Sequence, residues 1–174
     1  MKLRTARPSD RERILWITVA TFGPVSIDRN LEDRLGPLAS STWAERKCHA
    51  VGHECDEPDN VLVAVDSEDV VQGYATVRWD HETRVGSIPN VAVAPDHQGN
   101  GIGRTLLEAA IDLLRTRGAE AVRIETLEQN PIGRRLYPAL GFVEVARQIH
   151  YALRLDGPRP DAAPSGGADP SPPV

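Results

Sequence analysis

The sequence is poor in cysteine and in aromatic residues, and it has no long hydrophobic run. Two cysteines among 174 residues are too few for the disulfide framework of a small secreted domain. No stretch is apolar for long enough to span a membrane, and the N-terminus lacks the hydrophobic core of a signal peptide. We therefore expect a cytoplasmic protein with reduced thiols and no membrane partner.

An excess of positive charge is also absent. Lys and Arg total 20, Asp and Glu total 25, and the formal net charge is −5. Proteins that bind nucleic acid usually present a basic face, so we expect no nucleic-acid partner. The length suits one domain with a sizeable core, which we place at residues 1–155. Residues 156–174 are nearly half Pro and Gly, and we expect them to form a disordered tail.

A glycine-rich turn is the main feature of residues 90–107. Before it, residues 91–93 indicate a buried strand, which Pro95 ends. After it, apolar residues recur at helical spacing, and a C-cap is expected at Gly118. The residues with this spacing are Gly103, Leu106, Leu107, Ala110, Ile111 and Leu114. The pattern predicts a strand that passes through a tight turn into an amphipathic helix.

An anion site is predicted in this turn, which reads Gln98-Gly99-Asn100-Gly101-Ile102-Gly103. The first N–H groups of a helix have no partner within it and lie at the positive end of its dipole, so a phosphate is a natural ligand. The dinucleotide fingerprint would need glycine where Arg104 stands, and a Walker loop would need a lysine. The turn fits neither of these phosphate-binding classes.

A second patterned block occupies residues 120–142. Residues 121–127 alternate like a strand. Asn130 then supplies a helix N-cap, and Pro131 follows at the first helical position. The helix is expected to end at Gly141. A second strand–helix unit is thus predicted directly after the first.

Both blocks resemble the GCN5-related N-acetyltransferases (GNAT). Residues 98–103 match the pattern Gln-x-x-Gly-x-Gly directly after Val-Ala-Val, and this resembles the acetyl-CoA loop of that family. Asn130, Leu136-Tyr137 and Leu140-Gly141-Phe142 resemble its second signature. The resemblance implies a mixed α/β fold, with a central, mostly antiparallel β-sheet and helices on both faces.

The resemblance further implies direct transfer of an acetyl group from acetyl-CoA, as co-substrate, to an amine in a ternary complex. In the family a strand N–H polarises the thioester carbonyl, and N–H groups of the glycine turn bind the pyrophosphate. Asn130 would contact CoA as well as cap its helix. The cofactor-binding residues implied are Val91, Ala92, Val93, Gln98, Gly99, Asn100, Gly101, Ile102, Gly103, Arg104 and Asn130.

Two residues match catalytic roles of the family. Tyr137 corresponds to the general acid that protonates the departing thiolate; the alternative is a core tyrosine with a satisfied hydroxyl. Many members place a glutamate base on the strand before the glycine turn, but residues 86–90 contain no carboxylate. Glu125, on the next strand, is the candidate base, as in the acetyltransferases that modify the N-termini of ribosomal proteins. The alternatives are an ion pair with Arg123 or Arg78 and proton removal through water.

The acceptor is open between a small-molecule amine and a protein or peptide N-terminus, and a homodimer is also left open. A rival interpretation is a CoA-binding module without catalysis that acts as a sensor or interaction protein. The pattern of residues 25–59 is irregular, with possible helices at residues 31–35 and 41–51, and the resemblance implies that this part walls the acceptor site. They include a cluster, Cys48, His49, His53 and Cys55. Because Gly52 would break a helix there, we expect no metal.

Shorter patterns predict the remaining elements. Ser9 and Glu12 form a capping box for a helix that would end near Gly23. The last strand would carry its apolar residues mostly at odd positions. Strands are expected at residues 3–6, 61–66, 70–79, 84–93 and 142–155.

Overall fold

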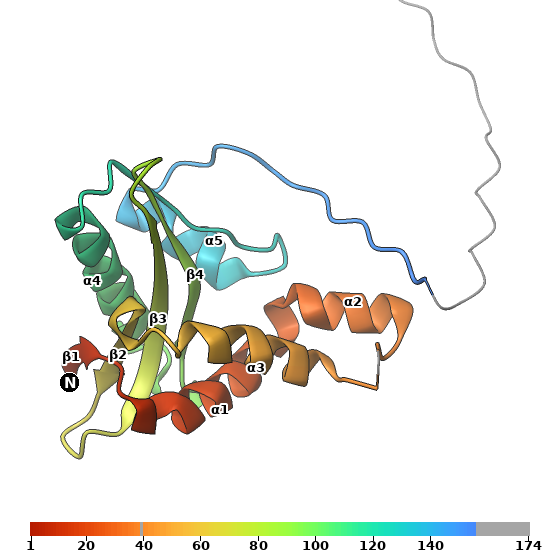
Figure 1. Ribbon diagram of the computed structural model, residues 1–174, viewed down its shortest axis with the longest axis horizontal. Coiled ribbons are helices and arrows are strands. Elements are labelled where there is room, and N and C mark those ends of the chain that lie inside the picture. The colour runs from red at the N-terminus through yellow and green to blue at the C-terminus, as the bar shows by residue number, and fades with distance from the viewer. Residues whose placement is uncertain (39, 156–174) are drawn as a thin grey trace, which may run out of the picture.

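The computed structural model describes residues 1–38 and 40–155 (Figure 1). One five-stranded sheet has the order β1-β2-β3-β4-β5. The pairs β1–β2, β2–β3 and β3–β4 are antiparallel, and the pair β4–β5 is parallel. The strands are β1 (Lys2–Thr5), β2 (Val61–Val65), β3 (Val71–Asp80), β4 (Val85–Val93) and β5 (Ala121–Arg123). The predicted tail lies outside the described residues.

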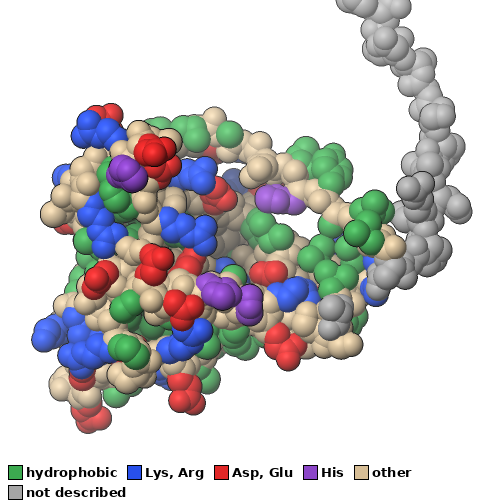
Figure 2. Space-filling model, in the orientation of Figure 1, with side chains coloured by type: hydrophobic (Ala, Val, Ile, Leu, Met, Phe, Trp, Pro, Cys, Tyr) green, Lys and Arg blue, Asp and Glu red, His purple; other side chains and the backbone are tan. Residues whose placement is uncertain are grey.

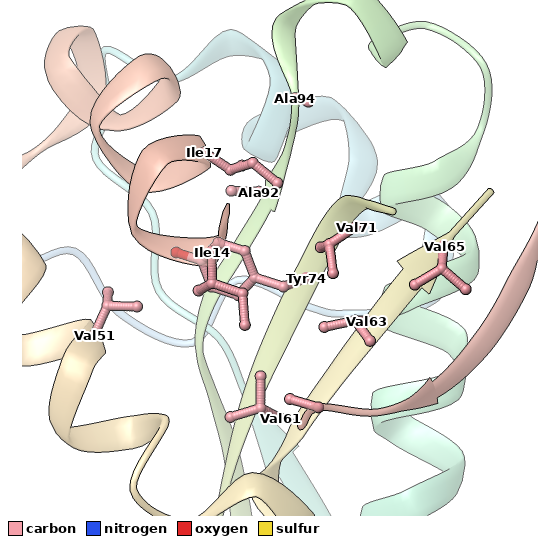
Figure 3. Packing of buried hydrophobic residues seen from close by; sticks show 11 residues of the cluster. Ile14, Ile17, Val51, Val61, Val63, Val65, Val71, Tyr74, Ala92 and Ala94 are labelled. Carbon is pink, nitrogen blue, oxygen red and sulfur yellow. The ribbon is translucent and has the colours of Figure 1, made fainter. Parts of the chain in front are cut away.

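Helices cover both faces of the sheet, so the predicted fold class is confirmed. On one face α1 packs Ile14 and Ile17 against Tyr74 of β3, and α3 lies against α1 (Figures 1 and 3). On the other face α4 buries Leu106 and Leu107 completely. The helices are α1 (Arg11–Phe22), α2 (Ile27–Leu35), α3 (Trp43–Glu54), α4 (Ile102–Thr116) and α5 (Pro131–Leu136). None of them is long and apolar enough to cross a bilayer, a statement limited to the described residues.

The parallel ladder between β4 and β5 is short. It joins Val85 to Ala121 and Ser87 to Arg123, while β4 continues to Val93. Pro89 has no N–H to donate to a neighbouring strand, and it stands two residues beyond the last pair. The strand predicted at residues 121–127 was therefore too long, because the chain leaves β4 after Arg123. An opening between the two strands results.

The start of α1 differs from the predicted capping box. A 3-10 turn, Pro8–Asp10, comes first, and α1 begins at Arg11. The backbone N–H of Arg7 donates to Asp10 Oδ2 at 2.7 Å, and Arg4 Nη1 donates to the same oxygen at 2.7 Å. Capping by Ser9 and Glu12 is therefore wrong: Asp10, buried beside Arg4, closes the turn instead.

Residues 25–59 form two helices, where the sequence indicates possible helices at residues 31–35 and 41–51. They contain α2 and α3, and α3 runs without a break through Gly52. A Cβ at Gly52 would lie 2.8 Å from the Arg11 guanidinium. The expectation that Gly52 breaks the helix is wrong, because glycine here allows close approach of Arg11 to α3.

The strand expected at residues 142–155 is not formed. The segment follows α5 and the 3-10 turn Pro138–Leu140 and crosses to α2 (Figure 1), where Arg154 Nη1 donates to Leu35 O. Its odd-numbered apolar side chains are exposed: Val143, Val145, Ile149, Tyr151, Leu153 and Leu155. Alternation alone does not make a strand, since a strand also needs a hydrogen-bonding partner along its length.

The packing of α4 leads to a stability prediction. Leu107→Ala should lower the free energy of unfolding by about 2–5 kcal/mol, because it removes a fully buried side chain from a closed core. Leu153→Ala is the matched control; that residue is 57% exposed, and its loss should cost less than about 0.5 kcal/mol. Urea unfolding measures both. Equal losses would contradict the assigned core.

Candidate active site

The opening beside β4 leaves backbone groups of that strand without a β-sheet partner. Ala94 N–H donates to Gln72 O of β3 at 2.8 Å. Because backbone groups alternate along a strand, those of Val91 and Val93 point away from β3, into the opening. The Gln98 Nε2 group donates to Val93 O at 3.1 Å from that side. The N–H groups of Val91 and Val93 are thus placed to bind a carbonyl oxygen there.

The glycine turn supplies a second set of amides. Gly99 and Gly101 have φ near +80°, at +79° and +80°, a conformation that favours glycine. Gly101 is the N-cap of α4 and has no side chain to cap it. The first bond of the helix is Thr105 N–H to Gly101 O, so the N–H groups of residues 102–104 precede the helical ladder. These amides lie at the positive end of the helix dipole, and the anion site stays a prediction.

Gly103 lies where the elements of the site meet. A Cβ added to it would be 3.7 Å from Val93 Cγ2 of β4 and 4.0 Å from Leu136 Cδ2 of α5. The start of α4 is therefore in van der Waals range of both β4 and α5. This contact brings the two predicted sequence blocks together at one place.

Asn130 has the predicted N-cap role at α5. Its Oδ1 accepts from Gly133 N–H at 3.1 Å, and its Nδ2 donates to Thr126 Oγ1 at 2.9 Å. Both the oxygen and the nitrogen of the side-chain amide thus already make hydrogen bonds within the protein. Contact between Asn130 and CoA stays a prediction.

Tyr137 ends α5 and packs against Phe142, with ring centroids 6.1 Å apart. Burial raises the pKa of its phenol to about 12, so the group is protonated at neutral pH, as a general acid must be. Within residues 1–38 and 40–155, no side chain or backbone group makes a hydrogen bond to this hydroxyl. The general-acid role of Tyr137 stays a prediction.

Two glutamates are candidates for the general base. Glu125 is exposed and lies two residues beyond the end of β5, on the chain that borders the opening. Its role as base stays a prediction. Glu54 of α3 was not foreseen from the sequence. Its Oε2 accepts from Asn90 Nδ2 at 2.6 Å, its Oε1 accepts from Arg78 Nη2 at 2.8 Å, and its side chain is 11% exposed.

Asn90 connects Glu54 to a lysine. Its Oδ1 accepts from Lys47 Nζ at 2.6 Å, and its Nδ2 also donates to Thr76 Oγ1 at 3.2 Å. Lys47 and Glu54 are seven residues apart, which places both on the side of α3 that faces the sheet. From the sequence, this spacing indicates a shared helix face only if one helix continues through Gly52. Asn90 directly precedes Val91, so this polar network adjoins the opening.

The rim of the site carries charges of both signs. Figure 2 shows this face hollowed between α3 and the chain around α5, with acidic and basic side chains close to the hollow. A cavity of about 420 Å³ lies near α2, where Gln129 Nε2 donates to Pro24 O at 2.9 Å. Its lining residues are Gly23, Pro24, Arg29, Asn30, Asp33 and Gln129. Residues 25–59 therefore contribute walls here.

The cysteine and histidine cluster is divided between two sides of α3. His49 Nε2 and His53 Nε2 are 3.3 Å apart on the exposed side, whereas Cys48 Sγ faces Leu15 O at 3.9 Å. Among the residues that the structure describes, no group of three or more His, Cys, Asp or Glu side chains is arranged to hold a metal ion. The cluster does not act as one unit.

A sheet that opens beside an uncapped helix N-terminus is an arrangement suited to a phosphate-bearing acyl carrier. The family model described as acetyltransferase (GNAT) family matches residues 29–142. The chain therefore belongs to the GNAT family, and the resemblance recognised in the sequence is confirmed.

The names of individual relatives state different acceptors. The [ribosomal protein bS18]-alanine N-acetyltransferase of Escherichia coli (strain K12) is 42% identical over 73 residues, 42% of this chain and 49% of that protein. Streptothricin acetyltransferase of Streptomyces lavendulae is 34% identical over 92 residues, 52% of this chain and 49% of that protein. The chain thus spans about half the length of these curated relatives.

Solved structures agree on the fold. An aminoglycoside N-acetyltransferase in complex with CoA aligns with a TM-score of 0.55 and 22% identity, covering 88% of this chain and 99% of that one. At this identity the likeness shows the fold alone.

The raised pKa of Tyr137 predicts how stability depends on pH. An unfolded tyrosine loses its proton near pH 10, whereas folded Tyr137 keeps it until about pH 12. Stability is therefore full below pH 10 and falls as pH rises towards 12, by about 1 kcal/mol at pH 11 from this group. Tyr137→Phe should remove that part of the loss. Urea unfolding at pH 8 and pH 11 tests it, and parallel losses in the two proteins would contradict it.

Proposed function

We propose that this protein is an acetyl-CoA-dependent N-acetyltransferase. The observation that carries the proposal is the opening between β4 and β5, directly beside the glycine turn and the uncapped start of α4. In this proposal the amides of residues 99–104 bind the pyrophosphate of acetyl-CoA, whereas the Gln98 N–H donates to Pro95 O at 3.3 Å. The two free, partly buried thiols, Cys48 and Cys55, suit a reducing compartment such as the cytoplasm.

The amides of Val91 and Val93 would polarise the thioester. A preorganised N–H donor at a developing oxyanion contributes about 3 kcal/mol to a transition state. The amine attacks the carbonyl carbon directly, so that a new N–C bond forms as the C–S bond breaks. The acetyl group passes from sulfur to nitrogen without an enzyme-bound intermediate.

Two protons must move during this transfer. The amine arrives as an ammonium with a pKa of about 8 to 10.4 and must lose a proton before attack; Glu125 or Glu54 takes it. The departing thiolate takes a proton from Tyr137. Because a thiol has a pKa of about 8.5 and the Tyr137 phenol one of about 12, transfer of this proton to the thiolate is uphill by about 3.5 pKa units, or about 5 kcal/mol. The phenolate must then regain a proton from solvent before the next turnover.

The relatives support an amine acceptor of two kinds. One is named for an alanine of a ribosomal protein, and another is named for streptothricin. A protein N-terminus and a small-molecule amine both remain candidates on this ground. A CoA-binding module without catalysis is the second candidate function, because residues 86–90 contain no carboxylate.

Release of CoA thiol with a panel of amines separates the two functions. The panel should include amino acids, aminoglycosides and peptides with a free N-terminus. The transferase should release CoA with at least one amine and should also be stabilised thermally by acetyl-CoA. Stabilisation without release would favour the binding module. Absence of both CoA release and thermal stabilisation would refute both functions.

Tyr137→Phe tests the general acid. It should lower kcat by about 10²–10⁴-fold, the usual contribution of a positioned acid, while the affinity for acetyl-CoA stays nearly unchanged. Tyr151→Phe is the control, because Tyr151 is 89% exposed. Steady-state kinetics and calorimetry measure the two quantities. Wild-type kcat in Tyr137→Phe would rule out the acid role.

Replacement of each glutamate by glutamine identifies the base. Loss of the true base should reduce kcat/KM about 10²–10⁴-fold at neutral pH and less at high pH, where more of the amine arrives neutral. Glu125→Gln and Glu54→Gln are compared with Glu120→Gln, which changes an exposed glutamate paired with Arg84. A wild-type pH–rate profile in both test variants would show that proton removal uses another route.

A further inference from the structure

Lys47 is an unusual cation in this chain. Eighteen of the twenty basic residues are arginine, and the two lysines are Lys2 and Lys47. Lys47 points from α3 towards the sheet, with Nζ 2.6 Å from Asn90 Oδ1 and 4.3 Å from the ring centroid of Phe22. Desolvation lowers the pKa of its ammonium below the ordinary value. A charge held in this way usually has a carboxylate partner.

The described part of the chain provides no carboxylate within 4.0 Å of Lys47 Nζ. The nearby acidic groups are engaged by arginines instead. Arg46 lies 3.8 Å from Asp28 and 3.5 Å from Glu32, and Arg78 pairs with Glu54 at 2.8 Å. Asp28 and Glu54 act on the Lys47 charge through space, but neither forms a direct ion pair with it, so the ammonium keeps unused hydrogen-bonding capacity.

The position of Lys47 relates this charge to the acceptor. Lys47 and Glu54 bind the two ends of one side-chain amide, that of Asn90. A positive and a negative group thus lie a few ångströms apart. Asn90 directly precedes Val91, whose N–H points into the opening beside β4. An acceptor that approached Val91 from the side of α3 would therefore pass this pair of charges.

We propose that the acceptor is a small amine that carries a carboxylate a few bonds from its nitrogen, as in an amino acid. This inference rests on the proposed function. The carboxylate binds Lys47 Nζ, and the ammonium lies beside Glu54 before it is deprotonated. A peptide N-terminus other than Asp or Glu lacks a carboxylate at that distance, because its α-carboxyl group is an amide, and an aminoglycoside offers no carboxylate.

Matched acceptors test the proposal without any variant. Free α-amino acids are compared with the corresponding α-amino acid amides, which keep the amine and side chain but lose the negative charge. The wild-type protein should acetylate the acid at least about tenfold more efficiently in kcat/KM, as expected when a charged hydrogen-bonding partner is removed. Equal efficiency for acid and amide would overturn the proposal and leave the acetyltransferase function intact.

Variants then assign the preference to Lys47. Lys47→Met keeps the length of the side chain and removes its charge, so the preference for the acid should disappear. Lys2→Met is the control, since Lys2 is exposed on β1, and it should keep the wild-type ratio. Affinity for acetyl-CoA, measured by calorimetry, shows that each variant is folded. A preference that persists in Lys47→Met would overturn the proposal.

Binding of the product separates failure of this inference from failure of the proposed function. N-acetyl-amino acids and their amides are titrated into the protein and followed by calorimetry. The acid should bind more tightly to wild-type protein and to Lys2→Met, but not to Lys47→Met. That result without turnover of any amine would support the anion site while refuting the transferase function. Equal binding of acid and amide, or binding of neither, would overturn the inference.

Discussion

The early end of the β4–β5 ladder is the constraint on which the site depends. A sheet satisfies backbone groups by pairing, and here pairing stops at Ser87 although β4 continues to Val93. The chain after β5 turns away to form α5, and the glycine turn places the start of α4 against the same edge. Unpaired strand amides and uncapped helix amides thereby adjoin one opening.

The two faces of β4 contribute different properties to that opening. Val91 and Val93 pack with the α4 core, whereas Asn90, Ala92 and Ala94 face α1 and α3. The first face is apolar and rigid, which suits a helix that must hold its amides in place. The second carries the charges around Asn90. The division follows directly from the alternation of side chains along a strand. One strand can therefore line both the proposed acetyl-CoA site and the proposed amine site.

Local patterns were sufficient to predict the central parts of the fold. The strand before the glycine turn, α4 and the Asn130 cap each depend on residues close in sequence. Features that depend on distant residues were missed. Asn90 meets Lys47 and Glu54 across 43 and 36 positions, and Asp10 replaces Ser9 because Arg4 is folded against it. Residues 142–155 alternate like a strand but have no partner.

Amide chemical shifts test the central claim most directly. Acetyl-CoA is titrated into ¹⁵N-labelled protein, and the shift of each backbone amide is followed to saturation. The largest changes are expected at residues 99–104 and at Val91 and Val93, because these amides would bind the pyrophosphate and the thioester carbonyl. Absence of saturable shifts at millimolar ligand, or shifts clustered away from the opening, would contradict it.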